Sequence, residues 1–381
     1  MGYVNINGNP IGAVNLNGLP INAVNLDGDV LTGTSDYNDY STEYERTILS
    51  VRDSMMAEAS EDDCIPLLIS TDQHGYLNTA HKTTFDYLNL AIPWNEVSAI
   101  VNIGDTCSGS YRETELSAFK NCMSSIRLDK QINVMGNHDV WLAGKVTIDG
   151  AEYSAGCIDN QTLEYSRDTY FNNSHYGNQY EYAGLTIETM IDEPRRVRYI
   201  TAGGWNFPDG IYYHYNLTTE AVSAIIDYLS RVDNYDVVFI SHCQPIIESK
   251  TWVHPAVDDE AQSEISKTWG YTGSLGYNIS LLNMLVDRKN KQAGTITDSQ
   301  GVVHQYDFTA CTSDILCTLH GHEHIDYYTV VDGMPIILFD AYRYDNAPMF
   351  MLNINRDREI VDIWKYDESC NVYNYQIPML T

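Results

Sequence analysis

Two histidines one residue apart, His322 and His324, follow an apolar run near the C-terminal end of the chain. The run at 316–319 predicts a buried strand, and Gly321 marks its end. On an extended segment alternate side chains point the same way, so we expect both imidazoles to reach one site. Histidine is the commonest metal ligand, and open α/β sheets bind ligands beyond the carboxyl ends of their strands. The motif by itself fits a polar turn equally well, so the rest of the chain has to decide.

Other predicted strands end in side chains of the same chemical kind. Apolar runs at 65–70, 97–103, 132–135 and 237–241 each predict a strand. The residues that follow them are Asp72 and His74, Asp105, Asn137 with His138 and Asp139, and His242. The first three strands and a predicted helix at 113–128 indicate a βαβαβ order, in which the parallel strands bring their carboxyl ends to one rim. Imidazole mixed with carboxylate and amide oxygen favours Mn²⁺, Fe or Zn²⁺ as the bound ion.

The composition is that of a globular and strongly acidic chain. With 381 residues, 44% of them apolar, the chain can bury one large core, or a core plus a small accessory domain. The formal net charge of −30 argues against binding to nucleic-acid backbones. The chain shows no apolar run of membrane-spanning length and no secretory signal, so we expect no membrane contact. Eight scattered cysteines predict reduced thiols in a cytoplasm, and Cys243 is interpreted as a buried small residue rather than a nucleophile.

The first 35 residues repeat with a period of ten. Segments 4–11, 14–21 and 24–31 each contain a short alternating strand, an Asn-Gly or Asp-Gly turn and another apolar pair. Such a unit cannot bury a core alone, so residues 1–35 are predicted to attach to other copies of the chain or to a larger assembly. A flexible leader is the alternative. The pattern resembles the β repeats at the N-termini of bacteriophage tail and virion proteins, which implies phage structural proteins as partners and the virion, or the host cytoplasm during assembly, as the location.

The remaining segments are assigned by local pattern. Residues 36–63 are interpreted as a linker and a leading helix that opens at Thr42. Residues 64–381 are the predicted catalytic domain, with insertions at about 141–200 and 246–312. The first insertion shows little helical period and carries strands at 180–190 and 195–202. Helices are expected at 219–232 and, in the second insertion, near 260–269 and 280–289. Strands at 327–331, 335–339, 349–354 and 359–366 are expected to form a second, largely antiparallel sheet.

Taken in order, these motifs resemble the five signature blocks of the calcineurin-like metallophosphoesterases. The blocks are Asp-x-His at 72–74, Gly-Asp at 104–105, Gly-Asn-His-Asp at 136–139, His242, and Gly-His-x-His at 321–324. The resemblance spans about residues 64–366. It implies an α/β fold in which two mixed β-sheets form a sandwich flanked by helices, with two divalent metal ions at the strand ends. The order of strands and helices predicted from the residues agrees with this fold.

The resemblance also implies a ligand set and a mechanism. One ion is held by Asp72, His74, Asp105 and His324, and the other by Asp105, Asn137, His242 and His322. A hydroxide that bridges the two ions attacks the phosphorus of a phosphomonoester or phosphodiester. His138 protonates the leaving oxygen as the general acid and Asp139 orients His138. For His138 the alternative is a structural role in a turn.

Departures from the family patterns leave the substrate open. Asp105 is followed by Thr106, Cys107 and Ser108, which excludes both the Asp-Arg-Gly pattern of protein Ser/Thr phosphatases and the Tyr expected of purple acid phosphatases. Arg112 is a candidate phosphate contact or an exposed residue at a helix start. Candidate specificity residues in the insertions are Trp205, His214, Trp252 and His254. The alternative function is a structural or glycan-binding virion protein that keeps the fold as a scaffold, and the acidic charge disfavours a nuclease.

Overall fold

The structure is a computed structural model of the whole chain. It describes residues 4–6, 9–11, 15–16, 19–20, 23–26, 29–32, 43–75, 96–109, 111–124, 130–142, 146–148, 151–153, 156–157, 160–183, 186–203, 217–245, 252–254, 259–261, 275–341, 349–367 and 370–379. The chain divides into two compact units, Met1–Thr47 and Ile48–Thr381. The two units are described separately.

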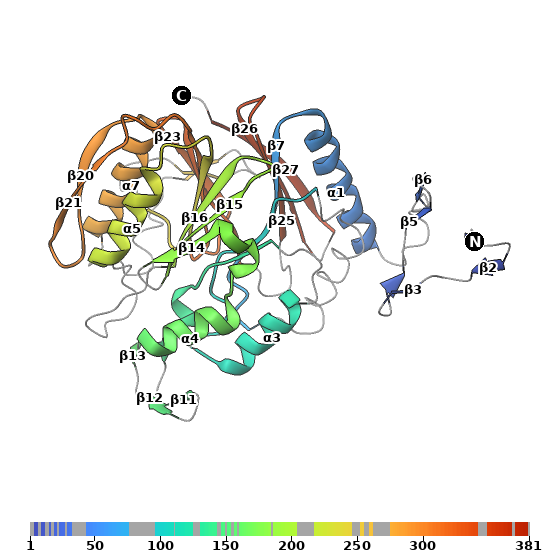
Figure 1. The fold of residues 1–381 in the computed structure, drawn as a ribbon, viewed down its shortest axis with the longest axis horizontal. Coiled ribbons are helices and arrows are strands. Elements are labelled where there is room, and N and C mark those ends of the chain that lie inside the picture. Colours follow the sequence, from blue (N-terminus) through green and yellow to red (C-terminus); the bar gives the residue numbers. More distant parts are fainter. Residues whose placement is uncertain are drawn as a thin grey trace. The chain divides into compact units, whose positions relative to one another are not determined.

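The first unit contains three antiparallel hairpins, which coincide with the three predicted repeats (Figure 1). They pair β1 (Val4–Ile6) with β2 (Asn9–Ile11), β3 (Asn15–Leu16) with β4 (Leu19–Pro20), and β5 (Ala23–Leu26) with β6 (Asp29–Thr32). Each of these strands pairs only with its neighbour among the described residues. The predicted boundary at residue 35 lies outside the described residues.

Two mixed sheets form the centre of the second unit, which confirms the predicted fold class (Figure 1). The six-stranded sheet has the order β27-β26-β25-β7-β8-β9, and the nine-stranded sheet has the order β14-β15-β16-β17-β22-β24-β23-β18-β19. The strands of the first sheet are β7 (Cys64–Ser70), β8 (Ala99–Asn102), β9 (Gln131–Asn133), β25 (Met349–Asn355), β26 (Ile360–Tyr366) and β27 (Val372–Pro378). The strands of the second are β14 (Tyr180–Ala183), β15 (Ile187–Asp192), β16 (Val197–Ala202), β17 (Asp236–Ser241), β18 (Trp252–His254), β19 (Asp259–Ala261), β22 (Ile315–His320), β23 (Tyr327–Val331) and β24 (Met334–Leu338).

Each sheet contains a run of neighbouring parallel strands, and these strands carry the candidate site residues. β7, β8 and β9 are parallel neighbours in the six-stranded sheet, while β16, β17, β22 and β24 are parallel neighbours in the other. β7 and β22 are buried along their whole length, as expected for strands that are covered on both faces. This burial explains why the sequence shows them as continuous apolar runs rather than as alternating ones.

The two sheets pack face to face around one apolar core. A single buried cluster contains Leu67 and Val101 of the six-stranded sheet together with Ile240, Leu319 and Ile337 of the nine-stranded sheet. Each such aliphatic side chain contributes about 1.5–3 kcal/mol to folding when it is fully buried. The core therefore holds the carboxyl ends of both sets of parallel strands at one rim.

Helices cover the sheets on their outer sides. α1 (Glu43–Glu61) is bonded to the six-stranded sheet, since Asn353 Nδ2 donates to the Met55 carbonyl oxygen at 2.8 Å. α5 (Thr219–Leu229) packs on β14, β15 and β16, and α7 (Leu275–Lys289) packs on β22. α3 (Glu113–Ser124) contacts α4 (Asn160–Tyr170). The helices predicted at residues 113, 219 and 280 are confirmed. None of the described helices has the length and apolar character needed to cross a membrane.

The first insertion contains a helix that the sequence interpretation missed. It holds α4, the 3-10 helix η3 (Ser174–Gln179) and the short strands β10 (Trp141–Leu142), β11 (Val146–Ile148), β12 (Ala151–Tyr153) and β13 (Gly156–Cys157), and it follows the 3-10 helix η2 (Asn137–Asp139). The buried side of α4 includes Leu163, Ser166, Arg167 and Tyr170. Their spacing is helical, but two of the four are polar, so the segment carries no clear apolar period.

The expectations for the second half are corrected in three respects. The closing strands do not form one antiparallel sheet, because β23 and β24 join the nine-stranded sheet and β25 and β26 join the six-stranded one. β20 (Ala293–Thr297) and β21 (Val303–Asp307) form a hairpin inside the second insertion, where only helices were predicted. Each of these two strands buries a single side chain, Ile296 or Tyr306, which leaves little pattern in the sequence. Of the helix predicted near 260–269, residues 260 and 261 belong to β19 and the rest lies outside the described residues.

Candidate metal centre

The loops that follow five parallel strands are tied together at the rim. The Asp72 backbone N–H donates to the Gly104 carbonyl oxygen at 2.8 Å, and the His74 N–H donates to the Asp105 carbonyl oxygen at 2.9 Å. The loop after β17 joins them through the His242 ring, whose Nδ1 lies 2.6 Å from the Ile103 carbonyl oxygen. The Gly321 N–H donates to the His242 carbonyl oxygen at 3.0 Å. These bonds bring the loops of both sheets into one site.

The first group of candidate ligands consists of Asp72, His74 and His324. His324 Nε2 lies 3.1 Å from Asp72 Oδ1 and 2.9 Å from His74 Nε2. One donor atom from each of the three residues lies within 4.8 Å of the other two. This group contains three of the four ligands that the resemblance implies for one ion.

The second group consists of Asp105, His242 and His322, with Asn137 beside them. His242 Nε2 lies 3.2 Å from Asp105 Oδ2 and 3.2 Å from Asn137 Oδ1. His322 Nδ1 lies 3.0 Å from the same Asn137 oxygen. Asp105 also belongs to a group with His74 and His138, which places its carboxylate between the two sets. The structure thus brings all seven predicted ligands together.

The donor atoms fit divalent metal ions in their spacing and chemistry. Two ligand atoms on a tetrahedral ion, at metal–nitrogen distances of about 2.0–2.1 Å, are about 3.3 Å apart. The nitrogen–oxygen and nitrogen–nitrogen separations of 2.9–3.2 Å in both groups are close to this value. In addition, the Nδ1–H of His242 donates to a backbone carbonyl, so its Nε2 atom is directed at the site.

Burial and mutual attraction set the charge of the site. Burial acts to raise the pKa of Asp72, but the imidazoles of His242 and His324 outweigh it, and that pKa is lowered. Burial opposes protonation of His242, yet the carboxylates of Asp105 and Asp72 raise its pKa to about 9. Burial also lowers the pKa of His322 to about 3, and the neighbouring His242 adds to the effect. The carboxylates are therefore ionised and His322 is neutral, as ligands must be, whereas His242 carries a proton that a bound metal ion would have to displace.

Several candidate ligands have left-handed backbone conformations. Asp72, His74, Asp105, His322 and His324 have φ values of 52°, 47°, 53°, 72° and 57°. Residues other than glycine rarely adopt positive φ, and such strain concentrates at functional sites. The expectation that His322 and His324 share one side of an extended strand is wrong, because β22 ends at His320 and the two rings project from a turn.

Two glycines of the motifs, Gly136 and Gly321, stand where a side chain would not fit. A Cβ on Gly136 would lie 2.2 Å from Asp105 Oδ1 and 2.3 Å from the Asp105 backbone nitrogen. A Cβ on Gly321 would lie 2.0 Å from Thr71 Oγ1 and 2.6 Å from Asp72 Oδ2. Each glycine therefore lets a second loop approach a candidate ligand carboxylate.

The predicted catalytic pair lies at the edge of the cluster. His138 Nε2 is 3.6 Å from Asp105 Oδ2, and the His138 side chain is 21% exposed, whereas that of His242 is fully buried. The Asp139 carboxylate accepts from the backbone N–H groups of Gly136 and Cys107, both at 2.9 Å. Burial raises the pKa of Asp139 to about 6. No hydrogen bond joins it to His138 in the described part of the chain, so its orienting role stays a prediction, while its observed bonds link two ligand loops.

Three buried side chains to which the sequence analysis assigned no role support the ligand loops. Thr71 Oγ1 donates to Asp72 Oδ2 at 2.7 Å. Gln244 Nε2 donates to Glu323 Oε1 at 2.8 Å, which links the loop after β17 to the turn between the two histidines. Burial raises the pKa of Glu323 to about 7. The only sequence signal for these residues is their position beside the ligands.

The other candidates from the sequence are placed as follows. Cys243 is 4% exposed and burial raises the pKa of its thiol well above the usual value, which fits a buried small residue. Arg112 is paired with Glu115 at 3.1 Å, and a phosphate contact stays a prediction. Trp205 and His214 lie outside the described residues, and only the backbone of Trp252 and His254, in β18, is described.

Comparisons with known proteins return structural likeness only. No protein-family model and no curated protein matches the sequence. Among solved structures, GAP50, the anchor in the inner membrane complex of Plasmodium, is 10% identical over 84% of this chain and 90% of its own, with a TM-score of 0.44. Phosphopantetheinyl hydrolase from Mycobacterium tuberculosis is 13% identical over 72% of this chain and 89% of its own, with a TM-score of 0.36. A predicted phosphoesterase from Streptococcus pneumoniae is 9% identical over 82% and 97%, with a TM-score of 0.31. Similarity at this level assigns neither a family nor an activity.

Proposed function

We propose that this chain is a calcineurin-like metallophosphoesterase that hydrolyses phosphomonoesters or phosphodiesters with two divalent metal ions. One observation carries the proposal: two groups of ligand-type side chains from five separate loops converge on a common carboxylate, Asp105. A carboxylate has two oxygens and can contact two ions, which an imidazole cannot do. Mn²⁺, Fe and Zn²⁺ are the ions that suit this mixture of imidazole, carboxylate and amide oxygen.

The ions, when bound, would supply Lewis acidity to the phosphate oxygens and a water molecule acidic enough to attack phosphorus at neutral pH. Asp72, His74 and His324 would hold one ion, and Asn137, His242 and His322 the other. Asp105, whose carboxylate lies between the two groups, would be a ligand of both ions. Its position is held in turn by the His138 N–H, which donates to Asp105 Oδ1 at 2.8 Å.

His138 is proposed to donate a proton to the leaving oxygen of the ester. Of the two imidazoles next to Asp105 Oδ2, those of His138 and His242, only that of His138 is exposed to the surroundings of the cluster. A general acid accelerates cleavage by stabilising the departing oxygen as an alcohol, typically about 10²–10⁴-fold. The ring is oriented edge to face with His74, whose centroid lies 4.9 Å away, so it stands directly beside a candidate metal ligand.

Metal titration tests the proposed function. Chelator-treated full-length protein, titrated with Mn²⁺ in a calorimeter, should bind two ions per chain and then hydrolyse members of a panel of mono- and diesters. Asp105→Asn should lose more bound metal than any other single ligand variant. Asp227→Asn is the matched control, because it removes the same charge from a side chain that is 67% exposed and lies on α5. A wild-type chain that binds no transition metal refutes the proposal and leaves the scaffold function.

We also propose that residues 1–35 attach the enzyme to a larger assembly, and the sequence resemblance names a phage virion as that assembly. Three self-paired hairpins support this proposal, because a two-stranded hairpin is marginally stable alone in water. Val24 pairs with Leu31 and Asn25 with Val30 in the third hairpin. The variant that lacks residues 1–35 should keep its turnover. Its sedimentation coefficient should be lower than that of the full-length protein by more than the lost mass explains, because the assembly is lost. A full-length chain that sediments as a monomer and binds no partner refutes the attachment role.

A further inference from the structure

The free edge of β9 is closed by a side chain instead of a strand. β9 is the last strand of the six-stranded sheet, and β8 lies on its other side. Asn133, which is 5% exposed, directs its N–H and carbonyl away from β8. Asn173 Oδ1 accepts from the Asn133 N–H at 2.9 Å, and Asn173 Nδ2 donates to the Asn133 carbonyl oxygen at 3.2 Å. A single amide therefore supplies both bonds that a neighbouring strand would make.

A buried carboxylate of the nine-stranded sheet holds this amide in place. Glu188 on β15 is 4% exposed, and its Oε2 accepts a short hydrogen bond from Asn173 Nδ2. Its Oε1 accepts from the Tyr180 hydroxyl at 2.7 Å, and Thr201 Oγ1 is 3.5 Å from Oε2. A continuous chain of hydrogen bonds thus runs from one sheet to the edge strand of the other.

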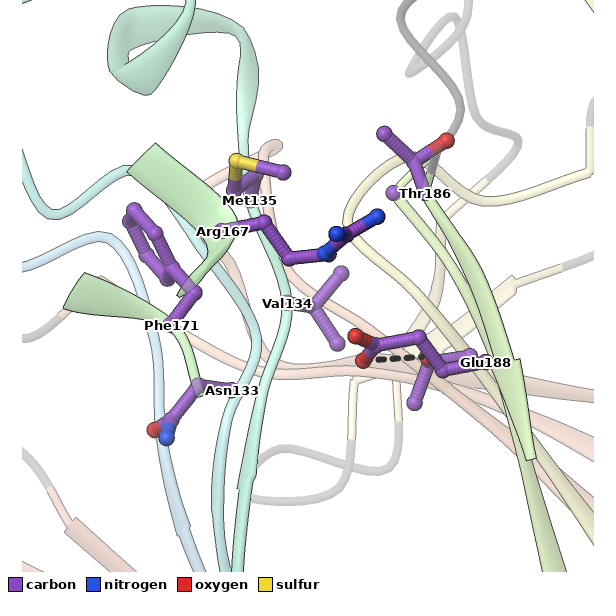
Figure 2. Close-up of a pocket in the computed structure, with 9 residues that line it drawn as sticks. Asn133, Val134, Met135, Arg167, Phe171, Thr186 and Glu188 are labelled. Atoms are coloured by element: carbon purple, nitrogen blue, oxygen red, sulfur yellow. Dashed lines mark hydrogen bonds between the residues drawn. The ribbon is translucent and has the colours of Figure 1, made fainter. Parts of the chain in front are cut away.

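A small hollow with both polar and apolar lining residues lies beside Glu188. Figure 2 shows Asn133 and Val134 on one side of a small hollow and Glu188 and Thr186 on the other, with the Arg167 guanidinium directed across it. The centre of a water molecule can move within only about 10 Å³ of this space, which is enough for about one water. The hollow is too small for a substrate group, so a structural role suits these residues better than a binding role.

β9, whose edge Asn173 holds by two hydrogen bonds, leads directly into the candidate metal centre. Only three residues, 134–136, separate Asn133 from Asn137, which contributes the amide oxygen of the second ligand group. Val134 and Met135 line the same hollow. Since the connecting segment is three residues long and buried, a sideways shift of β9 would be passed on to Asn137.

We propose that Asn173 and Glu188 are positioning residues for the metal position formed by Asn137, His242 and His322. They act by fixing the edge of β9, and they contact neither metal nor substrate. The inference rests on the proposed function, because it assumes that Asn137 binds an ion. The other position, formed by Asp72, His74 and His324, takes no ligand from the loop after β9. Its metal affinity should therefore depend much less on Asn173 and Glu188.

Calorimetric titration of full-length protein with Mn²⁺ tests this inference. Asn173→Ala should lower the affinity for the Mn²⁺ ion bound by Asn137, His242 and His322 by about tenfold, the lower end of the effect of groups that orient ligands. The affinity for the other Mn²⁺ ion should stay within about twofold of the wild-type value. Glu188→Ala should act in the same direction. Glu188→Gln should restore binding, because its amide oxygen can accept from Asn173 while its NH₂ donates to the Tyr180 hydroxyl. A role limited to overall stability would not produce this difference between the two ions.

Asn172→Ala is the matched control. Asn172 is exposed, and among the described residues its side chain accepts only from the Ser174 N–H, at 2.7 Å, so its loss disturbs the same loop without touching β9. Wild-type affinity for both ions in Asn173→Ala overturns the inference and leaves the proposed function intact. A wild-type chain that binds no Mn²⁺ overturns the proposed function instead. Should Asn173→Ala fail to fold, the comparison of Glu188→Ala with Glu188→Gln decides, and equal affinities in those two variants overturn the inference.

Discussion

Gly136→Ala is a sharp test of whether the geometry around Asp105 is what the metal centre requires. Gly136 has φ −96° and ψ −179°, an extended conformation that any residue adopts, so alanine brings no backbone penalty. Its Cβ would nevertheless lie 2.2 Å from Asp105 Oδ1, and contacts shorter than 3.0 Å essentially do not occur. Because the Cβ would also lie 2.3 Å from the Asp105 backbone nitrogen, either the backbone and carboxylate of Asp105 or the Gly136 loop must move, and the contact with Oδ1 requires at least about 0.8 Å.

A displacement of this size should be costly, since a misplacement of about 1 Å lowers turnover by about 10²-fold. We expect both Mn²⁺ affinities of Gly136→Ala to fall by about ten- to a hundredfold, because Asp105 serves both groups. Overpacking should also cost about 1–3 kcal/mol of folding free energy, so circular dichroism must show that the variant is folded before calorimetry. Gly203→Ala is the matched control, because its Cβ would lie 3.4 Å and 3.5 Å from the Met135 backbone nitrogen and oxygen, an ordinary contact. Normal binding of two ions by Gly136→Ala would refute the steric argument.

The remaining predictions concern the general acid and two buried groups. His138→Ala should retain two Mn²⁺ ions but lose turnover, by about 10²-fold or more for alkyl esters and much less for nitrophenyl esters; equal losses for the two would contradict the role of general acid. Burial raises the pKa of Glu188 to about 7 from 4.5, so its stabilising contribution is fully present below pH 4.5 and is lost as the pH rises through 7. The unfolding free energy of the wild type relative to Glu188→Gln should fall by about 2.5 kcal/mol from pH 5 to pH 8 in urea titrations, and a pH-independent difference would show that Glu188 is ionised throughout. Gln244→Ala removes the hydrogen bond to buried Glu323 and should cost about 1–3 kcal/mol at pH 8, with less loss at pH 5, where Glu323 is protonated; an unchanged urea midpoint at pH 8 would contradict this.

Much of the site was predictable because its signals are local. A buried parallel strand must be apolar along its length, and β7, β8, β17 and β22 therefore stand out as continuous runs. The chemistry of metal ligands is equally restrictive, so Asp, Asn and His directly after such runs indicate a metal site before any contact is known. The order of these strands and ligands is a property of the sequence itself.

Features that depend on contacts between residues far apart in the sequence were visible only in the tertiary structure. The Asp72 carboxylate accepts a hydrogen bond from the His322 N–H, 250 residues away, and no local pattern encodes this pairing. The division of the closing strands between two sheets, and the mostly polar helix α4, likewise became visible only once their partners were known. The bond from Asn173 to the edge of β9 is of the same kind, because an asparagine before a 3-10 helix has no sequence signal for the strand it caps. The sequence determined which side chains can bind metal and the order in which they occur, whereas their distances and supports follow from the burial of two sheets against each other.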